Sequence, residues 1–224
     1  MKSILLIILS ILLCAGTIHA EAEQTSRCHC FRNREFKIDD RFLADDYLLT
    51  TSFNSLVAST LDVSKKEIIM QMMQGGIAPS DLLIALYVSR QSGLTADILL
   101  AIHANGGTWQ EIMHSQTLKD KQNKTAILKS ITDGAEKETI LRGITFWMLK
   151  KRFGVSEKDL ACLQPYKFTY KETALLFALH KLTDTPIGLL IDLTKKQGMS
   201  WSEIAHNGGM SPSQVGKAIL EKRA

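Results

Sequence analysis

The residues best equipped for chemistry stand near the N-terminus, where Cys28, His29 and Cys30 are consecutive in a basic segment. Thiolate and imidazole groups are ligands that suit zinc or copper, and the neighbouring arginines favour the thiolate form. These three residues therefore offer a metal-binding or thiol-redox site. Adjacent ligands supply only part of a coordination sphere, however, and no second cluster of Cys and His follows in the chain.

The same cysteines have a structural alternative, which is a disulfide. Cys28, Cys30 and Cys162 follow the segment that we predict to be a leader, and an odd number of cysteines in an oxidising compartment leaves one thiol over. A bridge from Cys28 or Cys30 to Cys162 would close a loop of about 130 residues and stabilise the fold by several kcal/mol on chain-entropy grounds. We expect this disulfide and keep the metal or redox site as the alternative.

A second set of candidate ligands belongs to two matching Trp-x-Glu-x-x-His motifs, which contain Trp109, Glu111 and His114 and then Trp201, Glu203 and His206. Glu and His three residues apart share a helix face, and pairs of Glu-x-x-His helices help to hold two metal ions in ferritin-like bundles. Each Glu also completes a capping box, with Thr108 or Ser200 as the N-cap, which occupies its carboxylate. We therefore predict a structural role for all six residues.

The two motifs belong to an internal repeat of about 90 residues. Three blocks match in the same order at spacings of 92, 93 and 92 residues: 61–68 with 153–160, 82–86 with 175–179, and 106–114 with 198–206. This pattern predicts two copies, residues 43–117 and 135–224, packed about a pseudo-twofold axis. The charged segment between them, residues 118–134, is predicted to be a linker.

The elements of each copy have the signals of short helices. Ser64-x-x-Glu67 and Ser156-x-x-Asp159 form the pattern of a capping box, and Pro79 suits a first helical turn. Leading helices are expected over residues 43–60 and 136–152. No alternating strand pattern appears, so the sequence predicts an all-α, multi-helical bundle of short helices built from the two copies.

The N-terminus has the layout of a secretory signal peptide. Lys2 is followed by an apolar run over residues 4–13, and small residues allow cleavage after Ala20 or Ala22. Residues 1–20 are thus predicted to be a leader, residues 21–42 a basic Cys-His-Cys arm, and the protein to be exported, as a periplasmic or secreted chain. Membrane attachment would need an uncleaved leader or lipidation at Cys14, and the preceding Leu13 is unlike the small residue of lipoprotein leaders.

Residues 203–219 resemble a helix-turn-helix in the spacing of Ala205, Gly209 and Val215. The resemblance implies two short helices that meet at a wide angle. A reading helix also needs base-reading side chains with basic support, whereas the formal net charge is only +4 and spread along the chain. An exported chain does not meet the chromosome either, so we predict no nucleic-acid partner.

The sequence contains no glycine-rich phosphate loop, no nucleophile elbow and no paired-carboxylate motif. We therefore favour a non-catalytic module that binds a partner protein or envelope component in a groove between the two copies. No cofactor is predicted, apart from a metal ion at Cys28-His29-Cys30 under the alternative hypothesis.

Overall fold

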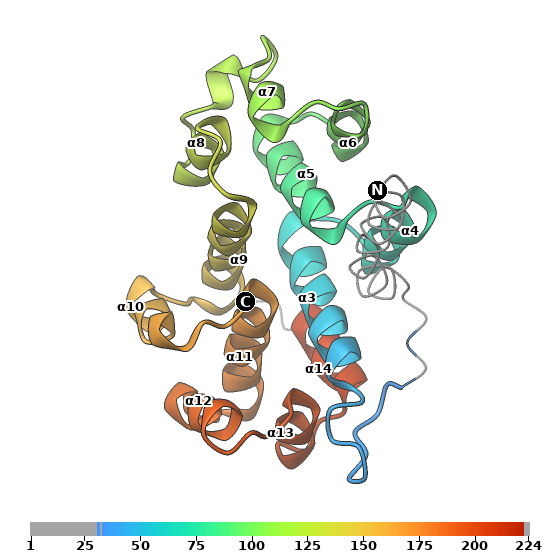
Figure 1. The fold of residues 1–224 in the computed structure, drawn as a ribbon, viewed down its shortest axis with the longest axis vertical. Helices are drawn as coiled ribbons and strands as arrows, with labels where there is room; N and C mark the ends of the chain where they lie inside the picture. The colour runs from blue at the N-terminus through green and yellow to red at the C-terminus, as the bar shows by residue number, and fades with distance from the viewer. Residues whose placement is uncertain (1–30, 32, 222–224) are drawn as a thin grey trace, which may run out of the picture.

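The structure is a computed structural model that describes residue 31 and residues 33–221. In this part of the chain it contains twelve α-helices, two 3₁₀ turns and no β-strand, which confirms the all-α prediction (Figure 1). None of these helices combines the length and the apolar character needed to cross a membrane.

The helices follow the same order in the two halves of the chain. The first half contains α3 (Asp45–Leu61), α4 (Lys65–Gly75), α5 (Pro79–Ser92), α6 (Ala96–Ala104) and α7 (Trp109–His114). The second contains α9 (Lys137–Phe153), α10 (Glu157–Ala161) with the 3₁₀ turn η2 (Gln164–Tyr166), α11 (Tyr170–Thr183), α12 (Ile187–Lys195) and α13 (Trp201–Asn207). A last helix, α14 (Pro212–Glu221), follows α13.

Two pairs of helices that hold the same place in this order also agree in length, whereas α4 has 11 residues and α10 has 5. The bounds of α3 and α9, both of 17 residues, differ by 92 at each end. The bounds of α5 and α11, both of 14 residues, differ by 91, as do their buried runs Leu82–Val88 and Thr173–Leu179. The spacing of 93 that the leucine-rich sequence blocks indicated is therefore two residues too long for this pair of helices.

Local sequence explains where several helices begin. The capping boxes predicted at Thr108, Ser156 and Ser200 are all present, and Pro79 is the first residue of α5. At Ser64 only half of the predicted capping box is present: the Ser64 hydroxyl accepts a hydrogen bond from the Glu67 backbone N–H at 3.0 Å, without the return bond to the Glu67 carboxylate. These caps satisfy N–H groups that the first turn of a helix leaves without a partner.

The four longest helices form the centre of the molecule. Figure 1 shows α5 and α3 in one column and α9 and α11 in a second column beside it, with the shorter helices around them. The two columns are in contact through α3 with α9, α5 with α9 and α3 with α11. Their shared interior buries large side chains, among them Tyr87 and Phe177, in one continuous apolar core.

The segment expected to be a linker contains ordered structure. Residues 118–134 include the 3₁₀ turn η1 (Lys119–Lys121) and the helix α8 (Ala126–Thr132), which packs against α7 and α9. Leu128 and Ile131 of α8 are buried. Seven residues give too few turns for an apolar stripe to stand out in the sequence, and the charged residues just before α8 obscured it.

Candidate functional site

The cysteine cluster predicted to bind metal or form a disulfide, Cys28, His29 and Cys30, lies outside the described residues. Cys162 is exposed and follows the last turn of α10, where its thiol donates a hydrogen bond to the Asp159 carbonyl oxygen at 2.8 Å. Partial burial and the charge of Asp159 raise the pKa of this thiol. No group of His, Cys, Asp and Glu suited to a metal ion occurs among the described residues.

The first Trp-x-Glu-x-x-His motif serves to position α7. The Trp109 ring is buried, and its indole N–H donates to the Asp81 carboxylate on α5 at 3.1 Å. The Glu111 carboxylate accepts the Thr108 backbone N–H at 2.8 Å, and this hydrogen bond lowers the pKa of Glu111. His114 is exposed beside Gln122. Glu111 and His114 thus point to different partners.

Asp81 connects this motif with the second half of the chain. Its carboxylate lies 2.9 Å from Lys137 Nζ, at the start of α9, and 3.5 Å from His103 Nε2 on α6. Burial raises the pKa of Asp81, but hydrogen bonds from Trp109 and Lys137 and the charge of Lys137 outweigh it, so the pKa is lowered. This carboxylate therefore joins α5, α6, α7 and α9.

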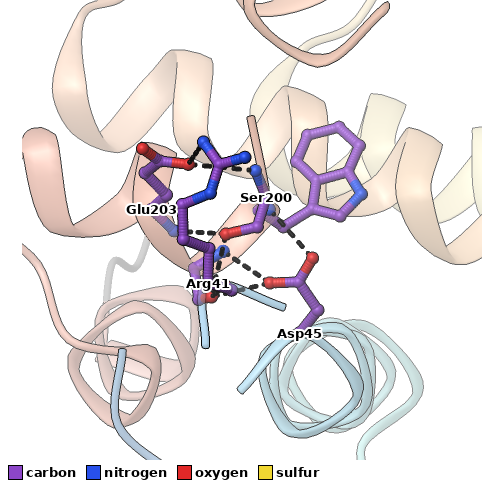
Figure 2. A network of polar contacts seen from close by, with 6 residues as sticks. Arg41, Asp45, Ser200 and Glu203 are labelled. Carbon is purple, nitrogen blue, oxygen red and sulfur yellow. Dashed lines mark hydrogen bonds and ion pairs between the residues drawn. The ribbon is translucent and has the colours of Figure 1, made fainter. Parts of the chain in front are cut away.

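The second motif lies in another network, which Figure 2 shows around Asp45 and Ser200. Asp45, on the first turn of α3, accepts the backbone N–H groups of Trp201 at 3.0 Å and of Ser202 at 2.8 Å. Glu203 pairs with Arg41 at 3.3 Å. Burial of Asp45 raises its pKa, although the hydrogen bonds from Ser202 and Trp201 oppose the shift. The network ties the start of α13 to α3 and to the segment that precedes it.

His206, the last residue of the second motif, stacks on Phe36 with ring centroids 4.8 Å apart. The two motifs thus hold α7 and α13 to different neighbours. Their contacts are those of helix-positioning residues.

A groove between α8 and α9 has a volume of about 450 Å³. We call it the α8–α9 groove, and its walls are Tyr87, Thr125, Ala126, Ile127, Ser130, Thr139, Ile140, Gly143, Phe146, Trp147, Lys150 and Glu157. Its volume and its mostly apolar and aromatic walls are typical of ligand-binding sites. It also lies where the first half, the α8 segment and the second half meet.

The floor of the groove is one face of α9. Ile140, Gly143, Phe146, Trp147 and Lys150 follow helical spacing over about three turns. A Cβ atom placed on Gly143 would lie 3.4 Å from Ile127 Cγ1, an ordinary van der Waals distance, so Ile127 of α8 packs over α9 at this point.

The aromatic wall of the groove is held in place from behind. Trp147 meets the buried Tyr87 ring edge-on, with centroids 5.3 Å apart, and Tyr87 shares a hydrogen bond with Thr125 at 3.2 Å. Lys151 Nζ lies 5.2 Å from the Trp147 centroid and donates to the Thr60 carbonyl oxygen at 2.6 Å. These contacts fix the indole of Trp147 before any ligand arrives.

None of the groove residues was predicted from the sequence to bind a partner or ligand. The available signal was a glycine inside a long helix, Gly143, followed by the aromatic pair Phe146 and Trp147. Such a pair also suits a core, and only the packing shows that both rings are half-buried beside a cavity. Comparison of the chain with protein-family models, with curated proteins and with solved structures finds no match.

Proposed function

We propose that the chain is a binding module whose α8–α9 groove receives a partner protein or envelope component. The observation that carries the proposal is an open, mostly apolar groove of about 450 Å³ beside a continuous buried helical core. Half-buried Phe146 and Trp147 supply the large aromatic surface that is enriched at the centres of binding sites. Lys150 and Glu157 add a charge of each sign to its wall.

The two halves of the module are, in this proposal, copies of one duplicated helical unit. The equal lengths of α3 and α9 and of α5 and α11, the common helix order and the capping boxes of α7 and α13 support the duplication. The groove then lies at the junction of the copies, as expected if a pseudo-twofold arrangement creates a site that neither copy has alone. The leader-like N-terminus supports export to the periplasm or beyond.

Site-specific photo-cross-linking tests the proposed binding. The photoreactive residue p-benzoylphenylalanine replaces Phe146 in the groove or, as a matched control, exposed Lys196, the residue that follows α12. Irradiation of cells that express each variant is followed by electrophoresis and mass spectrometry of the adducts. We expect one adduct of defined mass from position 146 only, which disappears when Trp147→Ala is added to the same chain. Equal adducts from both positions, or none from position 146, would contradict the proposal.

A further inference from the structure

The last helix, α14, covers one face of α3 more extensively than any other pair of described helices packs together. Its buried residues Pro212, Val215, Gly216 and Ile219 form the apolar stripe of an amphipathic helix. At the contact, a Cβ atom on Gly216 would lie only 3.1 Å from Thr51 Oγ1. The glycine therefore lets the two helices approach closely.

The face of α9 that lines the groove corresponds to this covered face of α3. Because the bounds of the two helices differ by 92 at both ends, Thr51 corresponds to Gly143 and Ser55 to Trp147. Thr51 and Ser55 are buried, with exposed fractions of 5% and 0%, whereas Gly143 and Trp147 are half-buried and line the groove.

The next helix extends the correspondence. Lys65 of α4 donates to Thr51 Oγ1 at 2.6 Å and lies close to where a Cβ on Gly216 would be, at 3.3 Å. Ser64 and Ser156 are the N-caps of α4 and α10, so the first residues of these helices, Lys65 and Glu157, correspond to each other. Glu157 lines the groove. The seat of α14 and the groove are thus built from equivalent positions.

The element that occupies the equivalent place on α9 is too short to cover it. α8 follows α7 as α14 follows α13, but it has seven residues against ten. It lies over Gly143 through Ile127 and makes a smaller contact with α9 than α14 makes with α3. The part of the face that includes Phe146, Trp147 and Lys150 therefore remains open.

We infer that the α8–α9 groove receives an amphipathic helix of the partner, with a small residue flanked by aliphatic residues as Gly216 is flanked by Val215 and Ile219. The inference rests on the proposed binding function and names the chemistry of the partner. A helix in this place would complete on α9 the cover that α14 gives to α3. Its apolar face would lie along Phe146 and Trp147, which is the helix-in-groove mode of recognition.

A synthetic peptide with the sequence of residues 209–224, which contains α14, provides the test. It is titrated into the ¹⁵N-labelled full chain, and the amide signals are followed by NMR. We expect shifts at residues 127–130 and 140–150. The control peptide with Gly216→Leu should bind at least about tenfold more weakly, because the larger side chain prevents the peptide helix from approaching α9 closely.

Three results would overturn the inference. One is the absence of shifts at peptide concentrations of about 1 mM, where even weak binding is visible. Another is a set of shifts at residues 48–58, which would mean that the peptide exchanges with the resident α14. The third is a groove response to monomeric dodecylphosphocholine but not to the peptide, which would assign the groove to a lipid-like ligand. A cross-linked adduct at position 146 without peptide binding would retain the proposed function and remove only this inference.

Discussion

Two glycines inside helices, Gly143 in α9 and Gly216 in α14, should respond in opposite directions to substitution by alanine. Alanine in a helix interior is more favourable than glycine by about 0.5–1 kcal/mol. At position 143 the new Cβ would lie 3.4 Å from Ile127 Cγ1, an ordinary contact, so Gly143→Ala should raise the free energy of unfolding by about that amount.

At position 216 the same gain is offset by crowding. The new Cβ would lie 3.1 Å from Thr51 Oγ1 and 3.3 Å from Lys65 Nζ. Lys65 Nζ donates a hydrogen bond to Thr51 Oγ1 at 2.6 Å, so neither side chain can move aside without breaking this bond. Overpacking costs about 1–3 kcal/mol, so Gly216→Ala should lower the free energy of unfolding by about 0–2.5 kcal/mol in total.

Urea unfolding of the two variants and the wild type measures both changes, provided that the slope with urea is unchanged. Gly188→Ala serves as the control, because a Cβ at Gly188 meets no atom within 4 Å. Changes of the same sign and similar size at positions 143 and 216 would refute the claim that α14 sits more tightly on α3 than α8 sits on α9.

Three further predictions concern the polar contacts and the leader. Asp45→Ala removes the acceptor of the hydrogen bonds at the start of α13 and should cost about 2–3 kcal/mol in urea unfolding, whereas Asp45→Asn, which keeps an acceptor oxygen, should cost clearly less. Burial lowers the pKa of Lys65 to about 8 from 10.5, so the folded state loses this proton at a lower pH than the unfolded state does. The wild type should therefore gain stability relative to Lys65→Met, on the order of 1 kcal/mol, as the pH rises from 8 towards 10, and a constant difference would contradict this assignment. Intact-mass analysis of the native chain should show cleavage after Ala20 or Ala22. Alkylation should label one thiol before reduction and three thiols after it. Labelling of all three thiols, Cys162 included, before reduction would exclude the disulfide.

The sequence predicted those parts of the fold that depend on local chemistry. The capping pairs at Thr108 and Ser200 place a hydroxyl and a carboxylate three residues apart, so the first turns of α7 and α13 could be located without knowledge of the packing. The leading helices were expected within one or two residues of the observed α3 and α9. Such signals act within one turn of the chain.

The candidate site could not be predicted in the same way, because it depends on what covers a helix face. Phe146 and Trp147 have the same sequence signature whether a neighbouring helix buries them or stops short of them. Their exposure follows from the length of α8 and from its contact at Ile127, both of which are tertiary properties. Asp81 likewise gains its partners from α6, α7 and α9 only in the folded chain.

Competition at the groove tests the central claim most directly. An extract that contains the native partner is irradiated with the chain that carries p-benzoylphenylalanine at position 146, with and without a saturating amount of the peptide of residues 209–224. If the groove holds a helix of the partner, the peptide abolishes the adduct and the Gly216→Leu peptide at the same concentration leaves most of it. An adduct that persists unchanged with the peptide would show that the partner does not occupy the groove as a helix of this kind.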